Sequence, residues 1–191
     1  MKRVVIFASG SGTNAENLIA FFNKGDMASV VLVLSNNPRS QVLERAKRLR
    51  VSAMSFNKIA LTETDDVLHV VEASKPDLIV LAGFLWKFPE HILKRFPNKV
   101  INIHPALLPK YGGKGMYGKF VHEAVVNNNE TESGITIHYV NENYDEGAVI
   151  FQAKCKVDPN DTPNDVASKI HELEMEHFPK VVERLLFQSD A

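Results

Sequence analysis

An amide, an imidazole and two prolines lie within eight residues near the middle of the chain. The apolar run at residues 100–103 contains Asn102 and leads into His104, and Pro105 and Pro109 bound the loop that follows. Residues two apart in a strand point to the same face, so Asn102 and His104 are expected to converge where this strand ends. The prolines fix the backbone around them, which suits a site that must hold its shape. The simpler alternative is a strand end whose polar side chains only meet water.

Asp145 precedes the strand-like segment at residues 148–157, and the resemblance to a known family that is described below, rather than its position alone, makes it the candidate carboxylate for the same site. An amide N–H can stabilise an oxyanion, and an imidazole beside a carboxylate can move a proton. A neighbouring carboxylate is expected to raise the pKa of His104 above its ordinary value of about 6.5. Asn102, His104 and Asp145 would then suffice to stabilise an oxyanion and move a proton, without a metal or a covalent intermediate. Read alone, a loop acid such as Asp145 is more often just solvated.

A glycine-containing loop near the N-terminus is the second candidate site. It consists of Gly10, Ser11, Gly12, Thr13 and Asn14, and with Ala15 it fits the Gly-x-Gly-x-x-Ala pattern of dinucleotide-binding folds. That fold needs an acidic residue about 20 positions on to hold the ribose, and residues 35–37 are Ser-Asn-Asn instead. The loop still offers free N–H groups and the positive end of a helix dipole, which favours a phosphate monoester. A tight turn without a ligand is the alternative.

Strand-like and helix-like segments alternate along the chain. Strands are expected at residues 3–8, 29–34, 51–56, 78–82, 100–103, 135–139 and 148–157, and helices at 14–24, 41–49, 62–73, 89–95, 119–127 and from 163 onward. This order predicts a single-domain α/β fold with a doubly wound, mainly parallel, Rossmann-like sheet, in which the last two strands are antiparallel. Residues 1–100 would form the phosphate-binding half and residues 101–191 the catalytic half.

Two local signals refine the predicted helices. Thr13 and Glu16 have the spacing of a capping box, which predicts the start of the first long helix. Pro179 is expected to bend or split the last helix, because proline lacks the N–H that a helix interior uses.

Composition excludes several classes of protein. A formal net charge of −1 and the lack of a basic run argue against nucleic-acid binding, and no apolar stretch is long enough for a membrane span. Cys155 is the only cysteine, so no internal disulfide is possible and a cytoplasmic location is expected. The seven histidines lack ligand-like spacing, so no metal is expected. A Gly-x-Ser-x-Gly elbow is also lacking, which argues against a serine hydrolase.

The motifs resemble those of the folate-dependent formyltransferases over nearly the whole chain. Residues 102–109 match the signature Asn-x-His-Pro-Ser-Leu-Leu-Pro, with Ala106 in place of the usual serine, and residues 81–84 match a Leu-Ala-Gly-Phe segment. Residues 9–14 resemble the loop that holds the substrate's phosphate in that family. Residues 145–150 resemble a run whose aspartate is catalytic, and residues 176–179 a stretch whose glutamate binds ribose hydroxyls.

The resemblance implies an enzyme that uses 10-formyltetrahydrofolate as cosubstrate and formylates the amine of glycinamide ribonucleotide. It implies a monomer or homodimer that binds small molecules only, with no nucleic-acid or membrane partner. The implied roles are catalysis by Asn102, His104 and Asp145, phosphate binding by residues 10–14 and ribose binding by Glu176. The implied folate-binding residues are Leu85, Trp86, Lys87, Phe88, Asn102, Val140, Asn141 and Tyr144.

Some features leave alternatives open. Residues 112–118 depart from the family pattern and look longer, and the basic residue that meets the folate tail in many members has only Lys58 as a nearby counterpart. Methionyl-tRNA formyltransferase and formyltetrahydrofolate hydrolase normally carry additional domains, which 191 residues would not accommodate. Two further functions remain as alternatives: that of a sugar-nucleotide formyltransferase and that of a nucleotide-binding module without catalysis.

Overall fold

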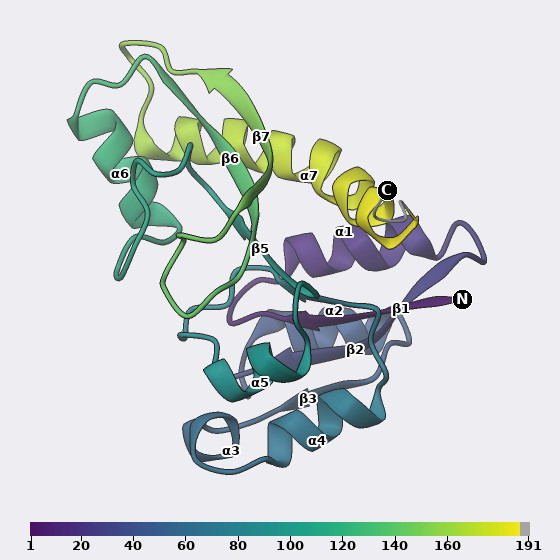
Figure 1. Ribbon diagram of the computed structural model, residues 1–191. Helices are drawn as coiled ribbons and strands as arrows, with labels where there is room; N and C mark the ends of the chain where they lie inside the picture. The colour runs from purple at the N-terminus through teal and green to yellow at the C-terminus, as the bar shows by residue number, and fades with distance from the viewer. Residues whose placement is uncertain (188–191) are drawn as a thin grey trace.

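A seven-stranded sheet in the order β3-β2-β1-β4-β5-β6-β7 runs through the computed structural model, which describes residues 1–187 (Figure 1). The strands are β1 (Lys2–Phe7), β2 (Ala28–Ser35), β3 (Ala53–Ser55), β4 (Leu78–Leu81), β5 (Val100–His104), β6 (Glu132–Tyr139) and β7 (Val149–Lys156). The first five strands are parallel, β6 is antiparallel to β5, and β7 is antiparallel to β6. The predicted mainly parallel sheet with an antiparallel C-terminal portion is confirmed.

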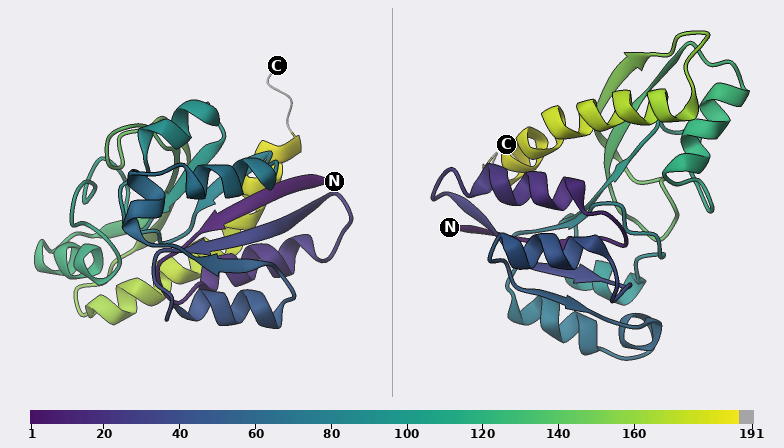
Figure 2. Two further views of the ribbon diagram at one scale, coloured as in Figure 1. Left: turned by 90° about the horizontal axis from the view of Figure 1, so that it is seen from below. Right: turned by 180° about the vertical axis from the view of Figure 1, so that it is seen from behind.

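Helices cover both faces of the sheet (Figures 1 and 2). One face packs against α1 (Thr13–Phe22), α2 (Gln41–Arg48), α6 (Lys119–Asn127) and α7 (Pro163–Phe187), and the other against α3 (Lys58–Thr62), α4 (Asp66–Ala73) and α5 (Glu90–Arg95). In β1, Val4 and Ile6 belong to the first core while Val5 and Phe7 belong to the second. From Val4 to Phe7 the strand is apolar at every position, because both of its faces are buried there.

The chain reverses its winding beside β1. From β1 the chain first adds β2 and β3 on one side, then crosses over to add β4 and β5 on the other. The loops that leave β1 and β4 therefore diverge, and open α/β sheets form their ligand crevice at such a point, beyond the carboxyl ends of the strands. The glycine loop follows β1, and Asn102 and His104 lie at the end of β5.

The start of α1 differs from its prediction. Gly12, rather than Thr13, is the N-cap residue, and no side chain caps the helix. Glu16 pairs instead with Arg45 and Arg48 of α2. The capping-box prediction was wrong because the guanidinium groups of a neighbouring helix offer Glu16 a stronger charged partner than a backbone N–H.

Pro179 does not split the last helix, since α7 runs without interruption from Pro163 to Phe187. Proline at this position leaves the carbonyl of Met175, four residues earlier, without its helical N–H. Nδ2 of Asn17 in α1 donates to that carbonyl at 2.9 Å. A side chain of the neighbouring helix therefore replaces the missing hydrogen bond. Over residues 1–187, no helix is long and apolar enough to cross a membrane.

Candidate active site

A cavity of about 630 Å³ opens beyond the carboxyl ends of β1, β4 and β5. The lining residues come from the glycine loop, from the segment after β4 and from the end of β5. The others come from the loops that precede α6 and β7, from α6 and from α7. Sequence-predicted residues among them are Gly10, Ser11, Gly12, Thr13, Asn14, Leu85, Asn102, His104, Tyr144 and Asp145. The fold thus brings the glycine loop and the three proposed catalytic residues to one crevice.

The glycine loop is held by its carbonyl groups. The carbonyl of Gly10 accepts from the N–H of Val42 at 3.2 Å, and that of Ser11 accepts from Nε of Arg45 at 2.8 Å. Within residues 1–187, no backbone N–H group of residues 10–14 donates to another protein atom. With their carbonyls tied to α2 and their backbone N–H groups unused, these residues offer free donors at the start of α1, where an anion could bind, and for this capacity we name them the anion-binding turn.

Gly12 is required where α1 meets α2. Its φ of +77° lies in the left-handed region, and a Cβ added there would lie 2.4 Å from Cγ2 of Val42. Only glycine lets the loop turn this sharply and pack this closely.

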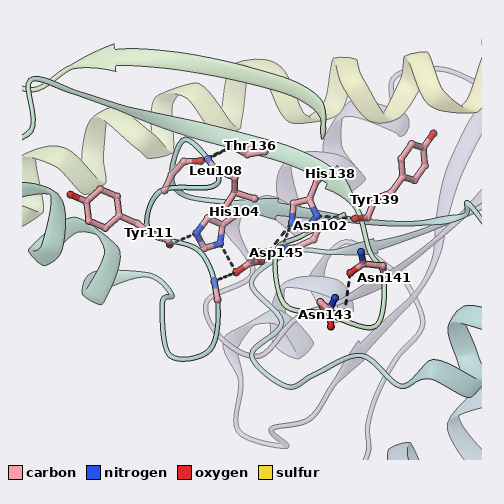
Figure 3. A network of polar contacts seen from close by, with 12 residues as sticks. Asn102, His104, Leu108, Tyr111, Thr136, His138, Tyr139, Asn141, Asn143 and Asp145 are labelled. Atoms are coloured by element: carbon pink, nitrogen blue, oxygen red, sulfur yellow. Dashed lines mark hydrogen bonds and ion pairs between the residues drawn. The ribbon is translucent and has the colours of Figure 1, made fainter. Parts of the chain in front are cut away.

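Asn102 is oriented by His138, which lies opposite it in the β5–β6 register. Nδ1 of His138 is 2.9 Å from the carbonyl of Tyr139, and a carbonyl can only accept, so the neutral ring carries its proton on Nδ1. Nε2 of His138 then accepts from Nδ2 of Asn102 at 3.1 Å (Figure 3). Nδ2 also makes a longer contact of 3.5 Å with Oδ1 of Asp145. The motifs pointed only to Asn102; the strand register is the signal that adds His138.

His104 is almost fully buried, and its two ring nitrogens have different partners. Nε2 lies 2.7 Å from the carbonyl of Tyr111, so it must be the donor, and Nδ1 lies 3.6 Å from Oδ2 of Asp145 (Figure 3). Burial lowers the pKa of His104 below its usual value, and the opposing effect of the Asp145 charge is smaller. The expected upward shift was therefore wrong. Moving an imidazolium from water into this buried site costs more free energy than its attraction to the carboxylate of Asp145 gains.

Asp145 lies between the two histidines. Oδ2 accepts from the N–H of Gly113 at 2.9 Å, and Oδ1 lies 3.6 Å from Nε2 of His138. Burial acts to raise the pKa of Asp145, but the contact with His138, the charge of His104 and the Gly113 N–H together lower it. The close approach of Gly147 to the Tyr139 carbonyl, where a Cβ would lie 1.6 Å away, holds this loop against β6.

The ribose-binding role predicted for Glu176 does not fit its position. The Glu176 side chain is 61% exposed and pairs with Lys180 on the outside of α7. Glu174 lines the cavity instead, and its Oε2 accepts from Nδ2 of Asn14 at 2.9 Å. Residues two apart on a helix lie about 200° apart, so only one of the two can face the cavity. Burial raises the pKa of Glu174, while the contacts with Asn14 and His171 oppose that shift.

A smaller cavity of about 60 Å³ adjoins the first. It is lined by seven of the eight predicted folate-binding residues: Trp86, Lys87, Phe88, Asn102, Val140, Asn141 and Tyr144. Leu85 lines the larger cavity, and Asn102, Tyr144 and Asp145 line both. Phe88 is 4% exposed and its ring packs edge-on against Phe7, with centroids 5.1 Å apart, so its side chain is mainly a core group. Of the candidate catalytic residues, Asn102 and Asp145 therefore lie where the two cavities meet, and His104 lines the larger one.

Lys58 lines a third cavity, of about 560 Å³, together with Phe56 and Trp86. Trp86 also lines the small cavity, so the two spaces adjoin. In the part of the chain that the structure describes, no three His, Cys, Asp or Glu side chains are grouped so that they could hold a metal ion.

An anion-binding turn, a buried amide–imidazole–carboxylate cluster and two adjoining cavities define a group-transfer enzyme that brings two substrates together. Residues 2–182 match the formyl transferase family, and the chain belongs to that family.

The relatives it resembles carry a more specific name. Phosphoribosylglycinamide formyltransferase of Haemophilus influenzae is 34% identical over 187 residues, which cover 95% of this chain and 86% of that protein. The chloroplastic phosphoribosylglycinamide formyltransferase of Arabidopsis thaliana is 34% identical over 201 residues, covering the whole chain and 69% of that protein.

Solved structures agree with the sequence relatives. Glycinamide ribonucleotide transformylase 1 of Geobacillus kaustophilus superimposes with a TM-score of 0.88 at 34% identity, over 97% of this chain and 99% of that one. Phosphoribosylglycinamide formyltransferase of Anaplasma phagocytophilum gives a TM-score of 0.88 at 30% identity, over 97% and 87% of the two chains. The single-domain formyltransferase fold expected from the motifs is therefore confirmed.

Proposed function

We propose that this protein transfers the formyl group of 10-formyltetrahydrofolate to the amine of glycinamide ribonucleotide, a step of purine biosynthesis. The family supports formyl transfer, and the names of the relatives support the acceptor. The observation that carries the proposal is that Asn102 and Asp145 line both cavities, with His104 beside Asp145 in the larger one. The larger cavity suits the phosphorylated amine. The smaller one has the aromatic side chains of Phe84 and Trp86 in its lining, against which a flat heterocycle would pack once the space of about 60 Å³ widens.

The acceptor would lie in the larger cavity. Its phosphate would bind the free N–H groups of residues 10–14, because a helix start favours an anion. Its ribose hydroxyls would then reach Glu174, which Asn14 holds beside the loop. The amine would be left facing the catalytic cluster at the other end of the cavity.

The formyl donor would occupy the smaller cavity. Its pterin would lie between residues 85–88 and residues 140–144, which enclose that space from two sides. The benzoyl-glutamate tail would pass Trp86 into the cavity that Lys58 lines, where the ammonium group can meet a tail carboxylate.

Formyl transfer requires a new C–N bond, a broken C–N bond and one proton moved. The acceptor amine attacks the formyl carbon, and the carbonyl oxygen becomes an oxyanion that Nδ2 of Asn102 stabilises in place of its long contact with Asp145. Nδ1 of His104 accepts the proton of the amine, because the Tyr111 carbonyl already occupies Nε2. Asp145 stabilises the imidazolium that results. The proton then passes to N10 of the folate as its bond to the formyl carbon breaks.

A spectroscopic assay with 10-formyl-5,8-dideazafolate tests this function. Deformylation should require glycinamide ribonucleotide, and glycinamide without the ribose phosphate should be a poor acceptor. Equal deformylation without any amine would indicate a hydrolase. Transfer to a sugar nucleotide in preference to glycinamide ribonucleotide would also contradict the proposal.

A further inference from the structure

The segment at residues 110–113, which we name the strap, contacts two catalytic residues through its backbone. The Tyr111 carbonyl accepts from Nε2 of His104 at 2.7 Å, and the N–H of Gly113 donates to Oδ2 of Asp145 at 2.9 Å. The backbone of the strap therefore holds His104 and Asp145, the residues that would move the proton. Whatever fixes the strap also fixes the two side chains.

The strap is anchored on its other side by the turn after α6. The hydroxyl of Tyr111 donates to Oε1 of Glu130 at 2.9 Å and accepts from Nδ2 of Asn128 at 3.0 Å. Nζ of Lys110 lies 3.0 and 3.1 Å from the two oxygens of Glu130. The backbone of Tyr111 has a φ of +57°, which a residue with a bulky side chain adopts rarely and keeps only where its surroundings hold it.

These anchors lie outside the substrate space. Tyr111 and Glu130 line a separate cavity of about 290 Å³. Neither is among the described residues that line the 630 Å³ cavity or the 60 Å³ cavity. A change at either residue can therefore reach the reaction only through the strap.

We propose that Tyr111, anchored by Glu130 and Asn128, is a positioning residue that keeps the proton of neutral His104 on Nε2. Nδ1 is then left free as the proton acceptor opposite Asp145. Without the anchor, the Tyr111 carbonyl can move away from the ring and a second tautomer, protonated on Nδ1, becomes populated. That tautomer cannot accept a proton on the side that faces Asp145. The kinetic consequence rests on the proposed function, whereas the tautomer is a property of the protein without substrates.

Three variants and a matched control test this role. Tyr111→Phe removes the hydroxyl, and Glu130→Ala removes the acceptor. Glu130→Gln keeps an acceptor oxygen and loses only the exposed pair with Lys110, which contributes little. Glu132→Ala is the control, because Glu132 lines the same cavity and pairs with Lys154 at 2.8 Å.

The tautomer is measured by ¹⁵N NMR of the imidazole in each unliganded protein, at a pH where His104 is neutral. The parent, Glu130→Gln and Glu132→Ala should show only the Nε2–H form, while Tyr111→Phe and Glu130→Ala should show a mixture. In the formyl transfer assay, kcat of these two should fall roughly tenfold, the typical effect of losing a hydrogen bond to a charged group, with KM unchanged for both substrates.

A single Nε2–H tautomer in both Tyr111→Phe and Glu130→Ala would overturn the proposal. An equal loss of kcat in Glu132→Ala, or a change in KM rather than kcat, would do the same. If the parent formylates no glycinamide ribonucleotide, the proposed function fails, and the tautomer comparison still decides whether Tyr111 positions His104.

Discussion

Asn14 at the start of α1 donates through Nδ2 to Oε2 of Glu174 in α7 at 2.9 Å, across 160 positions of sequence. Oδ1 of Asn14 is buried and has no partner among the described residues. The bond places a buried carboxylate next to the anion-binding turn. In the proposed binding mode, the turn would hold the phosphate of the acceptor and Glu174 its ribose hydroxyls.

Replacement of Glu174 should weaken binding of the acceptor. Glu174→Gln keeps an oxygen for Asn14 but loses the charge that would accept from the ribose hydroxyls. KM for glycinamide ribonucleotide should rise about tenfold or more, as expected for the loss of a hydrogen bond to a charged group, with a small effect on kcat. Glu176→Gln is the control and should leave both constants near the parent values. Equal effects at the two positions would contradict the assignment of Glu174.

Gly12 should be the least replaceable glycine of the anion-binding turn. Gly12→Ala imposes a positive φ on a residue with a side chain and drives its Cβ into Val42. The free energy of unfolding, measured with urea, should fall by roughly 2–4 kcal/mol. Gly10→Ala should change it by less than about 1 kcal/mol, because nothing lies within 4 Å of a Cβ there. Similar losses in the two variants would show that the contact with Val42 is not the cause.

The order of apolar and polar residues along the chain predicted those parts of the fold that depend only on neighbouring residues. The apolar run of β1 identifies a strand that is buried on both faces. The alternation of apolar and polar residues identifies β6 as a strand too, although the structure buries both of its faces from Ser133 to His138. The spacing of Asn102 and His104 predicted their convergence, since strand geometry fixes which residues share a face.

Other features of the site depend on contacts that sequence spacing does not reveal. Glu174 and Glu176 point to different sides of α7. Which of these sides faces the cavity is set by the packing of α7 against α1. The pKa of His104 depends on how far burial outweighs Asp145, and that balance needs the whole cavity. The bond from His104 to the Tyr111 carbonyl depends on the backbone of a loop with positive φ angles.

Burial of His104 should make the protein less stable in mild acid. Its pKa in the folded protein lies below the value of about 6.5 in the unfolded chain, so the unfolded chain binds this proton more readily. The contribution of His104 to the free energy of unfolding is constant above about pH 6.5. It declines as the pH falls through that value toward the lower pKa of the folded protein.

Urea unfolding of the parent and of His104→Gln at pH 7.5 and pH 5.5 measures this effect. The variant should lose less stability between the two values. Part of the loss should persist, because burial also lowers the pKa of His122. His69→Gln, at an exposed position on α4, is the control and should lose as much as the parent. An equal loss in His104→Gln and His69→Gln would contradict this account of His104.

Asp145→Asn tests the proposed proton transfer most directly. Asparagine can still accept from the Gly113 N–H, so the loop should keep its shape. It loses the charge that stabilises the imidazolium. With its oxygen on the Gly113 N–H, its NH2 group takes the place of Oδ1, beside Nε2 of His138 rather than Nδ1 of His104.

The measurement is single-turnover formyl transfer under saturating substrates, with binding of glycinamide ribonucleotide and of a folate analogue measured separately. Transfer should slow by about 10²–10⁴-fold, the range expected for loss of acid–base catalysis, while both dissociation constants stay within about threefold. A single-turnover rate near that of the parent, with binding unchanged, would show that Asp145 and His104 do not move the proton.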